Sequence, residues 1–496
     1  MSGFKPYLPV FSCWFRRCPA RHLAILLPAV LLVACSTSAP TPSESQAPLL
    51  SGFSTTAASL PIAVRWWESF DDPALDQLVS DSLQANQGLK AQWATVSQYR
   101  ALARQASAER YPEVNAALER EQTRSNGRLS ADQWQVALST SYELDFWGRV
   151  AALDDQARWQ ADARERAARV EANTVAAQVS LAWFGLISTT GQQHLLEQQQ
   201  LRTRQLLETT RGRYQRGQAA VTDIWQQEQL LVALQSELAT VLGQQRLYWQ
   251  QLALWSGRGD WLTPGSASAA LAARLPQRTL PESDRMVDEI AVGALQQRPD
   301  VEQAWLELQA ANAAWAAAVA NRYPRFTLSA SVGSGSESAS GLLDDWFTNL
   351  AAGLVMPVLD AGNRKAAVAE KNAAAQAALY RYHQALLEAA TEVQEALVNR
   401  DTARRQLQGI EQQLALAIRT EEYQTSGYYK GVVSYPQLLD AQKSRLELEN
   451  RQLDARWQQM QYRIQLYRAL SHGDFSATAN MYLPSAGQGS DQKVSE

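Results

Sequence analysis

Residues 324–333 read PRFTLSASVG, a stretch in which apolar and polar side chains alternate with a period of two. The apolar positions are Phe326, Leu328, Ala330 and Val332, and the polar positions between them are Thr327, Ser329 and Ser331. Alternation over about ten residues is typical of a transmembrane β-strand, which turns one face to lipid and the other to a lumen. The stretch therefore predicts a membrane strand at about 324–335.

Three further stretches, at about 112–123, 132–145 and 347–358, show the same alternation, in part more weakly. Aromatic residues bracket the four strands, as expected at membrane interfaces; they are Tyr111, Trp134, Phe146, Trp147, Tyr323, Trp346 and Phe347. The polar segments 124–131 and 334–345 are expected to be loops on the outside. The competing interpretation is two amphipathic hairpins lying on a soluble protein.

Four strands cannot close a barrel, because a bilayer does not tolerate open strand edges and bacterial barrels have about eight strands or more. The chain must therefore assemble with copies of itself. Two copies would give about eight strands and three about twelve, and the alternation does not choose between them.

An internal repeat organises the chain. Trp93 and Tyr111 recur 212 positions later at Trp305 and Tyr323, and the glycines at 148 and 217 recur 214 positions later at 362 and 431. We expect a mainly α-helical fold with membrane β-strands, built from two tandem repeats that each contain helices and a β-hairpin.

The repeat defines the domain boundaries. The first repeat is expected at 65–256, with a long helical hairpin at about 149–256, and the second at 284–473, with a hairpin at about 361–471. A connector, 257–283, joins them, and 474–496 form a polar tail expected to be disordered. Asp72 and Pro73 predict the start of a short opening helix.

The N-terminal segment 1–34 has the pattern of a secretory signal. Basic residues precede an apolar run from Leu23 to Ala34. The run ends Leu32-Val33-Ala34-Cys35, which resembles a bacterial lipobox and predicts a diacylglycerol and an N-acyl chain on Cys35. Lipoproteins that stay in the inner membrane usually carry Asp directly after the cysteine. Ser36 stands there instead, so we expect the anchor to lie in the outer membrane. The alternative is a signal peptide that merely contains a cysteine. With the lipobox, residues 35–64 are interpreted as a lipid anchor and a flexible linker.

Composition excludes several other classes of protein. Lys and Arg total 46 against 50 Asp and Glu, a net charge of −4, which argues against nucleic-acid binding. The four histidines are far apart and lack ligand-spaced partners, so no metal, cofactor or catalytic site is predicted. After residue 34 no apolar run approaches the roughly 20 residues of a membrane-spanning helix.

Longer motifs resemble those of one family. Residues 65–76, RWWESFDDPALD, resemble the opening of OprM-like outer-membrane efflux lipoproteins. Residues 141–149, SYELDFWGR, and 356–362, MPVLDAG, resemble the strand-to-helix signatures of the two repeats. Residues 429–435 and 438–442 are similar to the second hairpin tip. On these motifs the chain is identified as a member of the outer-membrane factor family, which includes TolC and OprM.

The resemblance implies a homotrimer with a twelve-stranded β-barrel in the outer membrane and a long α-helical barrel in the periplasm. It also implies a passive exit duct for drugs or other small molecules in a tripartite efflux pump. The partners would be a periplasmic adaptor, or membrane fusion protein, and an inner-membrane transporter of the resistance-nodulation-division type. The first alternative is the exit duct of a type I protein-secretion system. The second, which the sequence favours less, is a pore-less periplasmic coiled-coil scaffold.

The hairpin tips are the candidate working site. Their glycines suit helix ends, and Ser434 with Gln437 has the pattern of a capping box. The resemblance assigns adaptor docking to the tips, at Gly217, Ala220, Asp223, Gly431, Val433 and Ser434. It assigns the periplasmic gate to Tyr428, Asp440 and Gln437. Gln437 occupies a position where TolC-like members carry Asp, so the gate is expected to be less acidic than theirs.

Overall fold

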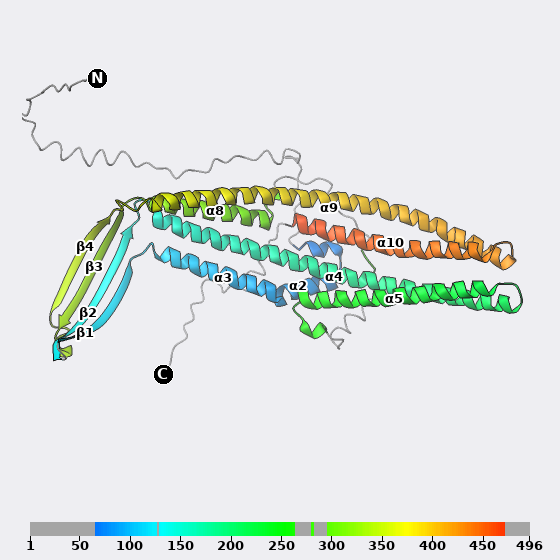
Figure 1. Ribbon diagram of the computed structural model, residues 1–496, viewed down its shortest axis with the longest axis horizontal. Coiled ribbons are helices and arrows are strands. Elements are labelled where there is room, and N and C mark those ends of the chain that lie inside the picture. Colours follow the sequence, from blue (N-terminus) through cyan, green and yellow to red (C-terminus); the bar gives the residue numbers. More distant parts are fainter. Residues whose placement is uncertain (1–64, 126–127, 263–278, 282–294, 472–496) are drawn as a thin grey trace, which may run out of the picture. The chain divides into compact units, whose positions relative to one another are not determined.

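The computed structural model describes residues 65–125, 128–262, 279–281 and 295–471, which all belong to one compact unit of the chain. The signal, Cys35, the linker, most of the connector and the tail lie outside these residues. The first repeat comprises η2 (Trp66–Phe70), α2 (Pro73–Ala85), α3 (Gln87–Ala108), β1 (Glu113–Ser125), β2 (Arg128–Leu144), α4 (Arg149–Gln215) and α5 (Val221–Trp255) (Figure 1). After η3 (Gly259–Trp261), the second comprises α8 (Pro299–Ala320), β3 (Arg325–Ser336), η5 (Ala339–Gly341), β4 (Trp346–Val355), α9 (Asn363–Lys430) and α10 (Tyr435–Leu470).

The two repeats have the same layout in three dimensions. Helices α4 and α9 begin 214 positions apart, and α5 and α10 also begin 214 positions apart. The hairpins share one register, because Glu113 pairs with Ser141 in the first and Arg325 with Val355 in the second. The expected mainly helical fold of two tandem repeats, each with a β-hairpin, is confirmed.

The four strands form one antiparallel sheet in the order β1-β2-β3-β4. Strands β2 and β3 come from different repeats and pair Thr140 with Ala330. Strands β1 and β4 are therefore the edges of the sheet within the chain. A single chain leaves both edges without a neighbouring strand from the described residues.

Three predicted strand ends were wrong. The segment 124–131 was expected to be a loop, but β1 continues to Ser125 and β2 begins at Arg128, so only 126–127 separate them. Backbone pairing does not require apolar side chains, and a polar strand end is compatible with water. Strand β4 was expected to reach 358 but ends at Val355, just before Pro357, which has no amide hydrogen to donate.

The register gives the sheet one apolar and one polar face. Because side chains alternate along each strand, directly paired residues share a face. One face carries Val114, Ala116, Leu118, Val136, Leu138, Phe326, Leu328, Ala330, Leu350 and Leu354. The other carries Glu113, Asn115, Glu119, Gln135, Ser139, Ser141, Thr327, Ser329, Ser331 and Asn349. The predicted alternation is thus continuous across all four strands.

A glycine marks each passage from strand to long helix. Gly148 and Gly362 have φ angles of 73° and 86°, a left-handed conformation that glycine adopts without a steric penalty. Asp145 and Asp360 then accept hydrogen bonds from amides in the first turn of α4 and α9. Ala361 also has a positive φ, 52°, although it carries a β-carbon. The second junction is therefore the more strained one.

Tryptophans fill the core where the short helices meet α4. Trp66, Trp93, Trp183 and Phe184 are fully buried there. Asp72 caps α2, as its position before Pro73 predicted, and also accepts a 2.8 Å hydrogen bond from Trp183 Nε1. One carboxylate thus starts α2 and attaches it to α4.

The long helices pack side by side in the order α9-α10-α4-α5, and nearer the sheet α3-α4-α8-α9. Arg298, buried at the start of α8, bonds Glu392 of α9 at 2.6 Å and the carbonyl of Ala469 in α10 at 2.9 Å. This guanidinium therefore fixes three helices of the second repeat together.

Among the described helices, none combines the length and apolar character needed to cross a bilayer.

Candidate functional site

Both hairpin tips close with the same hydrogen-bond pattern. Gly217 and Gly431, at φ 69° and 75°, end α4 and α9. The next residue's amide bonds a carbonyl five residues back: Gln218 N to Arg213 O at 2.9 Å, and Val432 N to Gly427 O at 3.0 Å. This is the Schellman pattern, in which a left-handed glycine satisfies carbonyls at the helix end. The predicted glycine turns are present.

The caps of the following helices differ between the tips. Gln437 Oε1 accepts from the amide of Ser434 at 3.1 Å and from its hydroxyl at 2.9 Å. At the equivalent place Asp223 Oδ2 accepts from the amide of Ala220 at 3.1 Å. Ala220 has no hydroxyl, so the first tip lacks the second of the two bonds that Gln437 accepts at the other tip.

A buried chain of hydrogen bonds joins the two hairpins just behind the tips. Tyr435 Oη, at the start of α10, donates to Gln227 Oε1 of α5 at 2.7 Å, and Gln227 Nε2 donates to the carbonyl of Thr203 in α4 at 3.2 Å. Burial raises the pKa of Tyr435, and Asp223 and Tyr428 raise it further. Its phenol therefore stays protonated and remains a donor throughout the physiological pH range.

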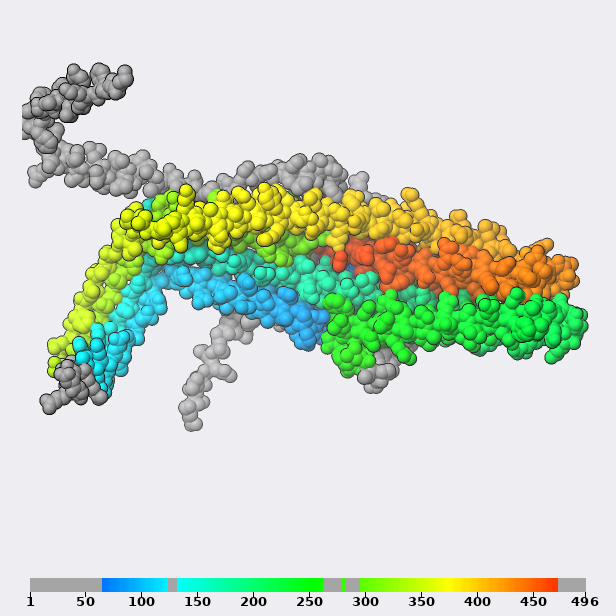
Figure 2. Space-filling model, in the orientation of Figure 1, coloured from blue at the N-terminus to red at the C-terminus, as the bar shows by residue number. Residues whose placement is uncertain are grey.

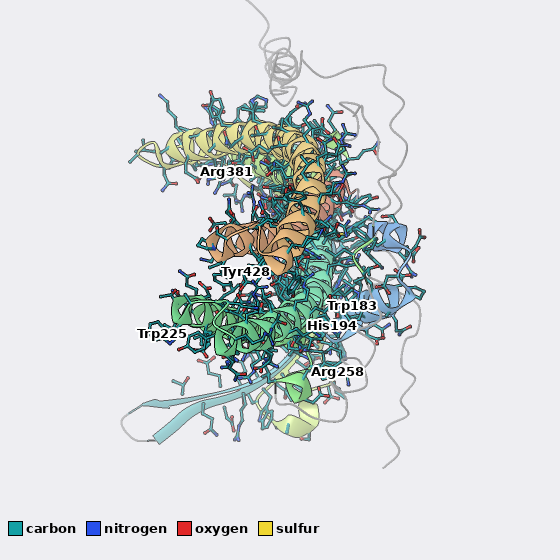
Figure 3. All side chains as sticks on the ribbon, turned by 90° about the vertical axis from the view of Figure 1, so that its right-hand side faces the viewer. Trp183, His194, Trp225, Arg258, Arg381 and Tyr428 are labelled. Carbon is teal, nitrogen blue, oxygen red and sulfur yellow. The ribbon has the colours of Figure 1, made fainter. Side chains whose placement is uncertain are left out.

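An arginine and two tyrosines complete this contact. The Arg213 guanidinium of α4 lies 4.5 Å from the ring centre of Tyr428 in α9, within cation–π range, and donates to the carbonyl of Tyr429 at 3.4 Å. Tyr428 and Tyr435 meet edge to face at 5.9 Å. Burial raises the pKa of Tyr428, whose hydroxyl faces Thr210. We call Arg213, Gln227, Tyr428 and Tyr435 the tip joint; Figure 3 labels Tyr428 on α9.

The predicted gate residues have different environments. Tyr428 is buried in the tip joint, whereas Gln437 and Asp440 are exposed on α10. Val433 packs against the buried cluster of the joint, and a β-carbon at Gly427 would lie 2.4 Å from its Cγ2. The turn is therefore closed by packing as well as by hydrogen bonds.

Sequence reasoning missed Gln227 and the role of Arg213 as a partner of Tyr428. Gln227 is fully buried, but a single glutamine in a glutamine-rich helix carries no signal of burial. Arg213 lies in the last turn of α4, where a cation suits the helix dipole, and nothing in the sequence points to its contact with Tyr428. Among the described residues, no group of three or more His, Cys, Asp or Glu side chains is placed to hold a metal ion.

The sheet and hairpins together define a class of protein. A sheet with one apolar face, joined through glycines to two long helical hairpins, is suited to form part of a membrane channel that continues as a helical conduit. The chain belongs to the outer membrane efflux protein family, whose family model matches residues 78–258 and 291–472. It is an outer-membrane efflux channel.

Individual relatives agree over nearly the full length. The pyoverdine export outer membrane protein OpmQ of Pseudomonas putida is 30% identical over 480 residues, covering 91% of this chain and 97% of OpmQ. The outer membrane protein OprJ of Pseudomonas aeruginosa is 30% identical, covering 92% and 97% of the two chains. A solved membrane protein from Pseudomonas aeruginosa superposes with a TM-score of 0.75 at 28% identity, covering 87% of this chain and 99% of that one.

Proposed function

We propose that three copies of the chain form the passive exit duct of a tripartite pump, with twelve strands in the outer membrane and the helices extending into the periplasm. The observation that carries this proposal is the continuous two-faced sheet with open edges, joined directly to paired helical hairpins. Closing the sheet edges with further copies removes unpaired backbone groups from lipid.

The pump partners follow from this role. A duct has no energy source of its own. An inner-membrane transporter would supply the energy, and a periplasmic adaptor would connect the transporter to the duct. OpmQ, which is named for pyoverdine export, supports a small-molecule cargo. We propose a transporter of the resistance-nodulation-division type. Export of proteins in a type I system is the alternative, and the cross-linking test below separates the two.

The gate is proposed at the hairpin tips, with the tip joint holding the closed arrangement. Asp440 is exposed on α10 beyond the joint, and three copies near a common axis would repel one another and attract cations. Asp440→Ala should therefore raise single-channel conductance and abolish block by cations. Unchanged conductance and block would place Asp440 outside the gate.

The anchor is proposed at Cys35. Lipidation there would hold the start of the chain at the inner surface of the outer membrane. The duct itself would not depend on the lipid, because barrel closure involves the strands alone.

Cross-linking from the tip in living cells tests the function. Ser434 is exposed at the turn, so a photo-reactive residue there faces a docked partner. Capture of an adaptor that also brings down a proton-driven drug transporter supports the efflux pump. Capture of an adaptor linked to an ATP-driven exporter favours protein secretion. No adduct from actively exporting cells would mean that the tip does not dock the adaptor.

A further inference from the structure

The opening motif at 65–76 lies in neither the sheet nor the hairpin tips, and the proposed duct gives it no role. Its first element, η2, is a 3-10 helix of only five residues. Three of its side chains are nonetheless buried almost completely, since Trp66, Trp67 and Phe70 are 0%, 3% and 3% exposed. Aromatic side chains dominate the energetics of the cores that bury them, so this short segment is firmly attached to its neighbours.

Trp66 joins the two repeats. Its ring stacks on the ring of Tyr467 in α10, with 6.0 Å between the ring centres and an angle of 13° between the planes. Its Nε1 donates to Asn173 Oδ1 of α4 at 3.0 Å, and Asn173 Nδ2 donates to the carbonyl of Arg468 in α10 at 3.0 Å. One side chain of η2 therefore contacts α4 of the first repeat and α10 of the second.

Phe70 makes a second connection between the same two helices. Its ring packs against Phe184 of α4 at 5.0 Å and against Tyr467 of α10 at 5.5 Å, both measured between ring centres. The Arg463 guanidinium of α10 lies 4.6 Å from the centre of the Phe70 ring, and its Nη2 donates to the carbonyl of Ser69 at 3.3 Å. Arg463 is only 6% exposed, and a cation–π contact is strongest when it is desolvated.

We call Trp66, Phe70, Arg463 and Tyr467 the clasp. It grips the last two turns of α10, roughly 40 Å along the helix from Tyr435 in the tip joint. In Figure 2 this end of α10 (red) lies beside α9 (yellow) and α4 (blue-green), away from both the sheet and the tips. Arg298, which donates to the carbonyl of Ala469, ties the same end to the start of α8.

The contact between α4 and α10 changes in character along its length. Among the described residues, the two buried apolar clusters that contain side chains of both helices lie at the clasp and at the tips. Between them the contacts are polar: Glu449 accepts from Arg202 at 2.6 Å, and Asp454 accepts from Gln192 at 2.6 Å. Water can replace a polar partner when two helices part, but it cannot replace an apolar one.

We infer that the clasp makes the last turns of α10 a fixed pivot, so that α4 and α10 part at the tips while they stay together at the clasp. This inference rests on the proposed gate at the tips and gives the opening motif a role in it. Parting at one end only must bend the helices between the clasp and the tip joint, and this resistance favours the closed tips. Arg463 acts through Phe70 and Ser69 and is a positioning residue.

Hydrogen exchange followed by mass spectrometry, on the full-length protein in detergent, tests the pivot. Tyr435→Phe, which removes a bond of the tip joint, should speed exchange in the first turns of α10 and leave residues 463–470 as protected as in the wild type. Arg463→Lys keeps the charge but loses the planar group that stacks on Phe70. It should speed exchange at 463–470 by about tenfold or more, and exchange at the tips should rise with it.

Two further variants control for general damage to α10. Arg456→Lys alters an arginine of the same helix that donates to Glu411 of α9 at 3.2 Å, within the second repeat, and should leave exchange at the clasp unchanged. Trp66→Phe keeps an aromatic ring and loses the bond to Asn173, so it repeats the test if Arg463→Lys does not fold. Its effect should have the same direction.

Three outcomes would overturn the pivot. The first is faster exchange at 463–470 in Tyr435→Phe, because α10 would then leave α4 as a whole. The second is wild-type exchange at the clasp in both Arg463→Lys and Trp66→Phe. The third is faster exchange at the clasp with wild-type exchange at the tips. Wild-type single-channel conductance in variants that exchange as expected would instead count against the proposed gate and leave the pivot intact.

Discussion

Tyr435→Phe removes one hydroxyl from the tip joint and leaves the ring in place. The lost bond is the 2.7 Å contact to Gln227 Oε1, and Gln227 is fully buried. An acceptor left unpaired in such a site costs about 1–3 kcal/mol. Since 1.4 kcal/mol is about a tenfold change in an equilibrium, the ratio of open to closed tips should rise about 5- to 150-fold.

The effect would be measured as single-channel conductance in planar bilayers and as sensitivity of cells to an antibiotic too large for ordinary porins. Both should increase. Tyr429→Phe is the matched control, because Tyr429 is half exposed at the same tip. Adding Gln227→Leu to Tyr435→Phe should restore much of the closed state, because removing both partners is less harmful than removing one.

The reasoning would be refuted by wild-type conductance and sensitivity in Tyr435→Phe. It would also fail if the double variant were at least as leaky as Tyr435→Phe alone, since the unpaired acceptor would then not be the cause. Neither result should depend on pH between 5 and 8, because burial raises the pKa of Tyr435 well above that range.

Three further predictions concern stability and anchoring. Ala361→Gly should raise the melting temperature in detergent by stabilising the fold by about 1 kcal/mol, because φ is 52° there, and an unchanged value would contradict the strain. Burial opposes charge on Glu449, but hydrogen bonds from Arg202, Gln199 and Arg445 outweigh it and lower its pKa. Its stabilisation is thus full above the unfolded pKa of about 4.3 and disappears as pH falls through the lower folded value, so Glu449→Gln should flatten acid unfolding curves below about pH 4. Cys35→Ser should abolish palmitate labelling, and normal labelling would refute the lipobox.

The sequence was sufficient to predict those features that repeat. The alternation of apolar and polar residues, with aromatic residues at the strand ends, located the strands. The glycines located the turns. Each of these signals reflects a local requirement of the backbone. The end of β1 was predicted less well, since pairing with β2 rather than side-chain polarity decides where a strand stops.

Features that depend on the partner helix were not predictable. Gln227 and Tyr435 lie 208 positions apart, and only the fold shows that they meet. Likewise Leu231 and Leu238, whose spacing of seven residues is typical of a buried helix seam, are only partly covered within one chain. The proposed homotrimer offers a reason, because a second copy would cover α5.

The unequal caps make the two tips mechanically different. At the second tip Gln437 binds both the amide and the hydroxyl of Ser434, whereas at the first tip Asp223 binds only the amide of Ala220. The first turn of α5, behind Ala220, should therefore fray more often than that of α10, behind Ser434, and its amides should exchange with solvent sooner. Movement at the mouth of the duct would then begin in the first hairpin, and the second would act as the stiffer support against which it bends.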